Sequence, residues 1–418
     1  MFQSLKKFLH SYIALSKPAK VKKKPAIALI TYCRGDYFEK VLNSILAQQI
    51  NNRPFSDFFD LYIFQDGLVE NAPQADTQGH QVIAQLCLQK LDSNHVITQT
   101  KNLGVALHFD LVERFLFEEQ DRPWAAFCED DLVLAPGYLA TLSNMAQCFK
   151  DDERVAMFSC FGKTSKETIA SQTAKQDALI SMDHHWGFGM HQSAWRRRQP
   201  LVDEYLKLLQ GTSYRARQHA RIQNWQSFCG FKPGPTSQDY AKACAMSALG
   251  ALKVSSYANF GTYIGEYGLH FTPELYAQKG YANSTIYPAA LTQPFQLDQG
   301  TYHQLLKEQK AFTMDTPDIF DQADFLRRLK AGSLAPSFSD QWQTGAISEA
   351  DVVAAYKLFL GRLPETRKVI EARIGMHPER FLASFITAPE FRARKQFAPI
   401  ILSLAKEIIN ENKKSATP

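Results

Sequence analysis

The strongest constraint on the fold is a short stretch in which an apolar run ends in three consecutive acids. Residues 124–128 read Trp-Ala-Ala-Phe-Cys, and the acids at 129–131 follow directly. An uninterrupted apolar run of this kind is typical of a strand buried on both faces of a sheet, and the Pro-Gly pair at 136–137 predicts a break before the next element. We therefore expect the acids to lie at the carboxyl end of a buried strand.

The position of these acids predicts a metal site. In an open α/β sheet, ligands bind in the crevice outside the carboxyl ends of the strands. Adjacent carboxylates in a partly buried crevice repel one another unless a cation neutralises them. Carboxylate oxygens suit Mg²⁺ or Mn²⁺, which also bind substrate phosphates. A solvated acidic loop after a strand is the alternative that these residues alone leave open.

Three more strand-like segments, residues 26–31, 61–64 and 95–99, precede the acidic stretch and alternate with helical patterns. This alternation predicts a doubly wound α/β sheet. Each segment ends beside residues that could face a ligand, although a surface salt bridge or an ordinary Asp-Gly turn would explain some of them equally well. These residues are Thr31, Tyr32 and Arg34 after the first segment, Asp66 after the second, and Asn102 and Gly104 after the third.

The Glu-Asp-Asp-Leu sequence at 129–132 resembles the Asp-X-Asp motif of the N-acetylglucosaminyltransferase I family, whose catalytic domain has the GT-A fold. The resemblance implies that Asp131 binds the metal ion and that Glu129 and Asp130 line the donor. It also implies a UDP-sugar donor. By the same resemblance, Thr31, Tyr32 and Arg34 contact the donor, Asp66 accepts a hydrogen bond from the uracil ring, and Asn102 and Gly104 approach the nucleotide.

The paired glycines at 187 and 189 lie beside aromatic residues and indicate a backbone that approaches a ring-shaped ligand, with Trp186 or Phe188 as a stacking surface. The family has a comparable segment under the donor sugar, which implies that Trp186 and Gly187 contact the donor. His184 and His185 would point opposite ways on an extended chain, which disfavours a shared metal ion. The three arginines at 196–198 favour a solvated helix face.

Asp239 is the candidate catalytic base. Ser237 is a favoured N-cap residue, and a carboxylate in the first turn of a helix can serve helix stability alone. The family, however, places its base in an acidic pair at the start of the corresponding helix, and here Gln238 replaces the first member of that pair. The resemblance therefore implies that Asp239 takes the proton of the acceptor hydroxyl in an inverting transfer.

His270 lies in a glycine-containing segment, residues 254–272, that we expect to close over the donor and exclude water. It is a candidate contact to the metal ion or the diphosphate, and an ordinary core or surface histidine is equally compatible with the pattern. Residues 210–227 are polar and basic and resemble an insertion on the acceptor side.

A chain of 418 residues is long for one domain. We predict a basic amphipathic N-terminal segment at 1–24, a GT-A domain at 25–286, a linker with short helices at 287–346, and a C-terminal all-α domain at 347–412. Ser348 and Asp351 fit a variant of the capping box. The last domain resembles a small helical domain of unknown function found beside bacterial glycosyltransferases, and docking of a protein or glycan is a hypothesis for it.

The seven cysteines are scattered and odd in number, which predicts free thiols in a reducing compartment. No apolar run approaches the roughly 20 residues needed to cross a bilayer. We therefore predict a cytoplasmic protein, and the basic N-terminal segment is compatible with peripheral attachment at the inner face of the cell membrane. The net charge of +5 is mild and does not suggest a nucleic-acid partner.

Together these features predict a metal-dependent inverting glycosyltransferase of bacterial origin. It would transfer a sugar such as GlcNAc from a UDP-sugar to a hydroxyl of a glycan or glycoconjugate acceptor in surface polysaccharide synthesis. A catalytically inactive GT-A shell that binds glycans remains the main alternative. A sugar nucleotidyltransferase is disfavoured because the first loop, residues 32–36, lacks the glycine-rich opening of that class.

Overall fold

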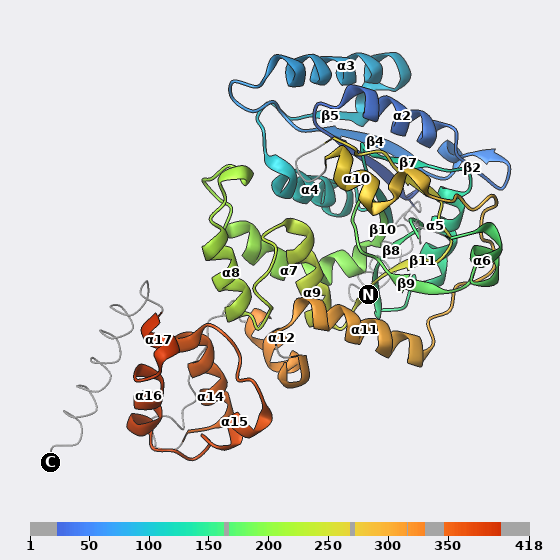
Figure 1. Ribbon diagram of the computed structural model, residues 1–418. Coiled ribbons are helices and arrows are strands. Elements are labelled where there is room, and N and C mark those ends of the chain that lie inside the picture. The colour runs from blue at the N-terminus through green and yellow to red at the C-terminus, as the bar shows by residue number, and fades with distance from the viewer. Residues whose placement is uncertain (1–22, 163–166, 268–271, 316, 331–346, 394–418) are drawn as a thin grey trace, which may run out of the picture.

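A computed structural model describes residues 23–162, 167–267, 272–315, 317–330 and 347–393. Its centre is an eight-stranded sheet with the order β5-β4-β1-β6-β10-β8-β11-β9 (Figure 1). In chain order the strands are β1 (Ala26–Thr31), β4 (Asp60–Gln65), β5 (Val96–Thr98), β6 (Trp124–Glu129), β8 (Val155–Ser159), β9 (Leu179–Ser181), β10 (Gly187–His191) and β11 (Leu252–Ser256).

The sheet is mixed and doubly wound, as predicted. β1 is parallel to β4 and β6, and β4 is parallel to β5, whereas β10 runs antiparallel to its neighbours β6 and β8. From β1 the chain proceeds outward through β4 and β5, then returns to β6 on the other side of β1. The strand order therefore reverses between β1 and β6, which is the position where open α/β sheets bind their ligands.

Two helical layers cover the sheet, and the alternation of side chains along β1 shows which helices face which side. Ile27 and Leu29 are buried in one core with residues of α2, α3 and α5, whereas Ala28 and Ile30 are buried in another with residues of α4 and α7. These helices are α2 (Gly35–Leu46), α3 (Gln74–Lys90), α4 (Gly104–Arg114, followed by a π turn at Phe115–Glu119), α5 (Tyr138–Cys148) and α7 (Gln192–Lys207).

A third apolar cluster joins α7 to the helices that follow it, and it includes residues of α8, α9 and α12. Figure 1 shows this helical group beside the sheet, with α11 running below it. The bounds are α6 (Ile169–Ala174), α8 (His219–Phe228), α9 (Gln238–Leu249), α10 (Pro273–Lys279), α11 (Gln299–Thr313) and α12 (Gln322–Lys330).

The prediction of a linker from residue 287 is wrong for its first part. Tyr287, Leu291 and Leu305 are buried in the same core as β1, and α11 is a helix of 15 residues. Prolines at 288 and 294 suggested breaks, and they do lie outside helices and strands, but apolar residues near them still pack in the same core. The catalytic body therefore extends past residue 286, to at least the end of α11.

Residues 254–263, the first part of the predicted closing loop, are also more regular than expected. β11 takes up the first of them, and β12 (Gly261–Tyr263) pairs antiparallel with β7 (Leu132–Leu134), directly after the acidic residues. A second short pair is formed by β2 (Gln49–Ile50) and β3 (Arg53–Pro54). The β12–β7 pair brings Tyr263 to the acidic stretch.

The C-terminal helices form their own apolar cluster, which contains Val352, Phe359, Ile370, Phe381 and Phe385. Ser348 and Asp351 form the predicted capping box. The helices are α14 (Glu349–Ala355, followed by a π turn at Tyr356–Leu360), α15 (Arg367–Glu371), α16 (Pro378–Ile386) and α17 (Pro389–Ala393).

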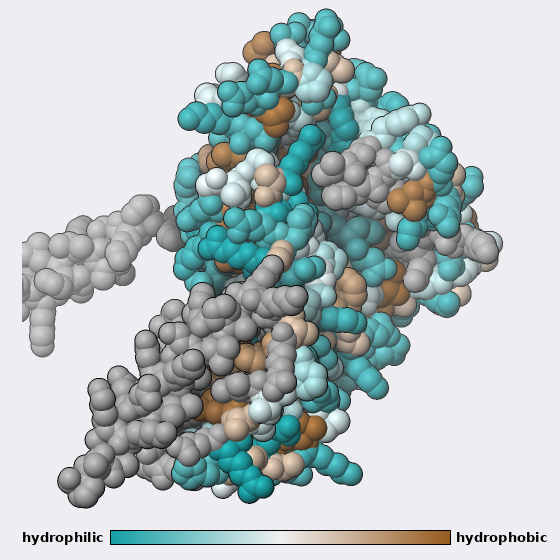
Figure 2. Space-filling view, turned by 60° about the vertical axis from the view of Figure 1, so that its left-hand side comes forward, coloured by the Kyte–Doolittle hydropathy of each residue, from teal (hydrophilic) through white to brown (hydrophobic). Residues whose placement is uncertain are grey.

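The amphipathic helix predicted near the N-terminus lies outside the described residues. Within the described ranges, every helix is too short or too polar to span a bilayer. All seven cysteines are free, as predicted. On the face seen in Figure 2, hydrophilic side chains predominate and hydrophobic ones occur as small separate patches.

The close packing of β10 generates a stability prediction. A Cβ atom on Gly189 would lie 2.2 Å from Cε2 of the buried Phe158. We expect Gly189→Ala to lower the free energy of unfolding by about 1–3 kcal/mol, because the ring has to move within a packed core. Urea unfolding followed by circular dichroism measures the loss.

Gly300→Ala is the matched control. Gly300 is exposed in the first turn of α11, where an added Cβ atom would lie 3.2 Å from Oδ1 of Asp298, so we expect Gly300→Ala to change stability by less than about 0.5 kcal/mol. A Gly189→Ala protein as stable as Gly300→Ala would contradict the packing described for β10.

Candidate active site

The acids at the end of β6 lie against the end of β1. The Thr31 hydroxyl donates to Oδ2 of Asp130 at 2.6 Å, and Nη2 of Arg34 donates to Asp130 and, at 2.8 Å, to Oδ2 of Asp131. Both aspartates are buried. One guanidinium from the first βα loop thus supplies positive charge to two carboxylates from another strand.

The charge of this cluster is only partly balanced. Burial raises the pKa of Asp131 to about 6, although Arg34 acts in the opposite direction. Burial, with Asp131 and Asp239 nearby, raises the pKa of Glu129 well above its usual range. Carboxyl groups in this state gain from an additional cation, because the cation favours their ionised form.

A divalent cation fits the residues present. Oδ1 of Asp131 is buried and makes no hydrogen bond. In the part of the chain that the structure describes, no three His, Cys, Asp or Glu side chains gather as a ready metal site. Mg²⁺ and Mn²⁺ at phosphate-binding sites commonly take one or two protein carboxylates and complete their shell with phosphate oxygens and water, which suits Asp131. His270, the other candidate ligand, lies outside the described residues.

Asp66 holds the loop that follows β5. Its Oδ1 accepts from the N–H groups of Gly67 and Leu103 at 2.9 and 2.8 Å, and its Oδ2 accepts from Gly104 N–H and Asn102 Nδ2 at 2.9 and 3.0 Å. This structural role was not foreseen from the sequence. The uracil contact stays a prediction, and it would have to compete with these bonds.

Gly104 begins α4 with a positive φ of 72°, a conformation that favours glycine. A Cβ atom here would lie 2.7 Å from Cβ of Tyr214, in the short 3₁₀ turn η4 (Tyr214–Ala216). The close approach at Gly104 is therefore made by a protein side chain from the predicted acceptor-side insertion. Tyr32 is also tied into the first loops, since its hydroxyl accepts from Val69 N–H at 3.3 Å.

Trp186 lies beside the acids, because its carbonyl accepts the Glu129 N–H at 2.8 Å. We expected its ring to offer an open surface for stacking, but other rings cover it. Its ring stacks on Tyr263, with centroids 3.6 Å apart and planes 11° apart, and on His184, with centroids 4.6 Å apart. A sugar would have to displace one of these rings to stack on Trp186.

Packing also explains why Phe188 and Gly187 occur beside Trp186. Phe188 is buried and stacks on Phe127, so its ring is not available to a ligand either. A Cβ atom on Gly187 would lie 2.4 Å from Leu132 Cδ2 and 2.7 Å from the Tyr138 hydroxyl. The glycine is thus required by the contact between β10 and these side chains, whatever its relation to the donor.

Asp239 lies in the first turn of α9, and Ser237 caps that helix by accepting from Tyr240 N–H, as predicted. The Asp239 side chain is 49% exposed, and its Oδ1 meets Nδ1 of His185 at 2.8 Å. Burial opposes ionisation, but His185, followed by Lys242 and Lys253, lowers the pKa of Asp239 to about 2. The candidate base is therefore ionised and accessible, and its charge is felt by Glu129.

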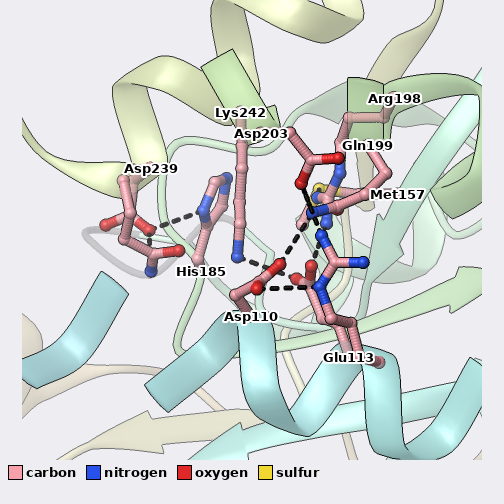
Figure 3. Close-up of polar contacts among 11 residues, drawn as sticks. Asp110, Glu113, Met157, His185, Arg198, Gln199, Asp203, Asp239 and Lys242 are labelled. Atoms are coloured by element: carbon pink, nitrogen blue, oxygen red, sulfur yellow. Dashed lines mark hydrogen bonds and ion pairs between the residues drawn. The ribbon is translucent and has the colours of Figure 1, made fainter. Parts of the chain in front are cut away.

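A buried ion-pair triad holds α9 in place (Figure 3). Glu113 of α4 is fully buried, and its two oxygens meet Nη2 of Arg198 in α7 at 2.5 Å and Nζ of Lys242 in α9 at 2.8 Å. Burial alone would raise the pKa of Glu113, but the two cations lower it. The triad links α4, α7 and α9 to one another.

The expectation of a solvated arginine face is wrong for Arg198. Arg196 is exposed and Arg197 partly so, whereas Arg198 faces the core. Three consecutive residues of a helix point in three directions about 100° apart, so one of them can face inward. The sequence does contain a residue that indicates a buried cation nearby. Glu113 is a charged residue among the apolar residues Phe109, Val112 and Leu116 on the core side of its helix.

A doubly wound mixed sheet with paired acids and an arginine at its switch point fits the GT-A class of fold. The comparison with protein families agrees with this class. The model of the GNT-I family, a family of N-acetylglucosaminyltransferases, matches residues 4–205. Among curated proteins, none matches the chain.

The matched segment covers β1 to α7 and so contains Thr31, Arg34, Asp66 and the acids at 129–131. The resemblance to this family therefore covers every strand of the main sheet except β11, and the protein is a glycosyltransferase. The match ends before Asp239, so the assignment of the base remains a prediction.

The buried triad yields a prediction with a built-in control. Arg198→Ala leaves the charge of Glu113 buried with one cation removed, and we expect a loss of about 3–5 kcal/mol in the free energy of unfolding. The adjacent Arg197 pairs at 3.2 Å with Glu153, whose side chain is 83% exposed, so Arg197→Ala should cost less than about 1 kcal/mol. Urea denaturation of both variants measures the difference, and equal losses would contradict the triad.

Proposed function

We propose that this protein is a metal-dependent inverting glycosyltransferase that moves GlcNAc or a similar sugar from a UDP-sugar to a hydroxyl of a glycan or glycoconjugate. The observation that carries this proposal is the buried Asp131 at the switch point, with one oxygen lacking any hydrogen bond and with Arg34 at the other. The family match supports a nucleotide-sugar donor and a divalent ion.

In the proposed reaction, the acceptor oxygen attacks the anomeric carbon while the bond from that carbon to the diphosphate oxygen breaks. The electron pair of that bond leaves with the diphosphate, and the acceptor proton passes to Oδ2 of Asp239. Arg34 would either turn from the aspartates toward the phosphates or stay between the aspartates and the phosphates. Bound Mn²⁺ or Mg²⁺, held by Asp131, would supply Lewis-acid stabilisation of the leaving group.

The acceptor is assigned to the side of the crevice formed by η4, α8 and the start of α9. Tyr205 and Arg217 both donate to the carbonyl of Thr236, at 2.9 and 3.2 Å, which ties residues 205–217 to the segment that leads into Asp239. Free cysteines support a cytoplasmic site of synthesis, and a bacterial surface polysaccharide is the proposed product.

Calorimetric titration tests the donor site. We expect UDP and UDP-GlcNAc to bind in the presence of Mn²⁺, GDP to bind more weakly, and Asp131→Ala to abolish the metal-dependent part of binding. Asp239→Asn should bind the donor normally but lower kcat of sugar transfer by about 10²–10⁴-fold, since it removes the base. Absence of uridine nucleotide binding in the wild-type protein would contradict the proposal and favour a glycan-binding shell.

The pH dependence of metal binding provides a second test. The metal ion binds the ionised carboxylate of Asp131, whose pKa is raised to about 6, so protons compete with the ion below that pH. We expect the Mn²⁺ affinity, measured by calorimetry with UDP present, to rise about fivefold between pH 5 and pH 6, about tenfold in all by pH 7, and to level off above that. Asp131→Asn, which cannot titrate, serves as the control, and an affinity that is flat over this range would exclude Asp131 as the ligand.

A further inference from the structure

The carboxylate of Asp239 is held from one side only. Nδ1 of His185 lies 2.8 Å from its Oδ1, and the side-chain amide of Gln238 donates to the same oxygen at 2.7 Å. Figure 3 shows the second carboxylate oxygen pointing away from His185. The carboxylate is thus fixed in orientation while one oxygen remains directed elsewhere.

The order of burial in this pair determines which residue can meet a substrate. The His185 side chain is 2% exposed and that of Asp239 is 49% exposed. In a serine hydrolase triad the histidine faces the substrate and the aspartate stands behind it. Here the order is reversed, so Asp239 can contact an acceptor and His185 can act only through Asp239.

The partners of the two ring nitrogens determine the tautomer of His185. The ionised carboxylate of Asp239 can only accept, so Nδ1, which lies 2.8 Å from it, carries the single proton of the neutral ring. Nε2 is then left as an acceptor, and Nζ of Lys253, in β11, lies 3.5 Å from it. That proton points at Oδ1 of Asp239.

The ring is neutral at physiological pH. Burial is the largest influence and lowers the pKa of His185 to about 4, although Asp239 acts in the opposite direction. Lys253 and Lys242 also lower this pKa, whereas the carboxylate of Asp239 raises it. A neutral donor orients the carboxylate without cancelling its negative charge.

Lys253 is held by α11, which lies in the region that we expected to be a linker. Its backbone N–H donates to Oε1 of Gln309 in α11 at 3.0 Å, and Nε2 of Gln309 donates to the carbonyl of Ala251 at 2.8 Å. The chain of contacts therefore runs from α11 through β11 and His185 to the first turn of α9.

We propose that Lys253 and His185 are positioning residues that hold Asp239 with its Oδ2 toward the acceptor hydroxyl. Without them, a carboxylate in the first turn of a helix is free to turn back to the N–H groups of that turn, which attract it. This inference rests on the proposed function for its catalytic meaning, but the contact itself can be tested separately.

The contact is tested by nuclear magnetic resonance on the full-length protein labelled with ¹⁵N-histidine, in which the His185 signals are those missing from His185→Asn. We expect a neutral ring with its proton on Nδ1 from pH 8 down to about pH 5 in the wild-type protein. In Lys253→Met, which removes the donor at Nε2, we expect the Nε2 signal to shift while the proton stays on Nδ1, which still faces the Asp239 carboxylate; an unchanged Nε2 signal would remove Lys253 from the proposal. A ring protonated on Nε2 alone, or a charged ring at pH 7, would overturn the proposal.

Turnover distinguishes positioning from simple packing. With UDP-GlcNAc, Mn²⁺ and water as the acceptor, we expect His185→Leu to release UDP about 10–100-fold more slowly, with an unchanged KM for the donor. His185→Asn, whose amide can donate near the position of Nδ1, should recover most of the rate. Equal rates for these two variants, or a loss confined to KM, would reject a positioning role.

These experiments distinguish failure of the proposed function from failure of the positioning proposal. If wild-type protein binds no uridine nucleotide, the transferase proposal falls while the His185 tautomer is still observed. If nucleotide binding and turnover are normal but the tautomer is absent, the positioning proposal alone falls. Melting temperatures of the variants, compared with that of Arg197→Ala, show whether a loss of rate reflects unfolding.

Discussion

Buried carboxylates are tolerable only when positive charge is brought to them, and this holds both at the strand ends and between the helices. Arg34 supplies it to Asp130 and Asp131 at the switch point. Arg198 and Lys242 supply it to Glu113 between three helices. In each case the cation comes from a different element, so the pairing also joins elements far apart in the sequence.

The two halves of the candidate site differ in how their charge is balanced. On the donor side, burial raises the pKa values of Glu129 and Asp131, which is the state of carboxyl groups that gain from a further cation. On the acceptor side, nearby cationic groups lower the pKa of Asp239 and keep it ionised. The candidate site thus combines buried acids whose charge is only partly balanced with a separate accessible carboxylate that is kept ionised.

Part of the candidate site could be predicted because its signals are local. An apolar run followed by acids marks a buried strand end, and Ser237 before Asp239 marks a helix start, so these positions followed from periodicity and capping. The roles of Asp66, Trp186 and Arg198 could not be predicted this way. Asp66 meets the N–H groups of Leu103 and Gly104, and Trp186 meets Tyr263, through contacts between distant parts of the chain.

The sequence by itself determined the doubly wound sheet, the acidic strand end at 129–131 and the free thiols, because these depend on the order of residues along short segments. Only the tertiary structure decided that α11 packs on the catalytic body, that Arg198 is buried with Glu113, and that His185 stands behind Asp239. The physical reason is that a charge or a ring has no fixed partner until folding excludes water around it. The packing of separate elements then selects which groups meet.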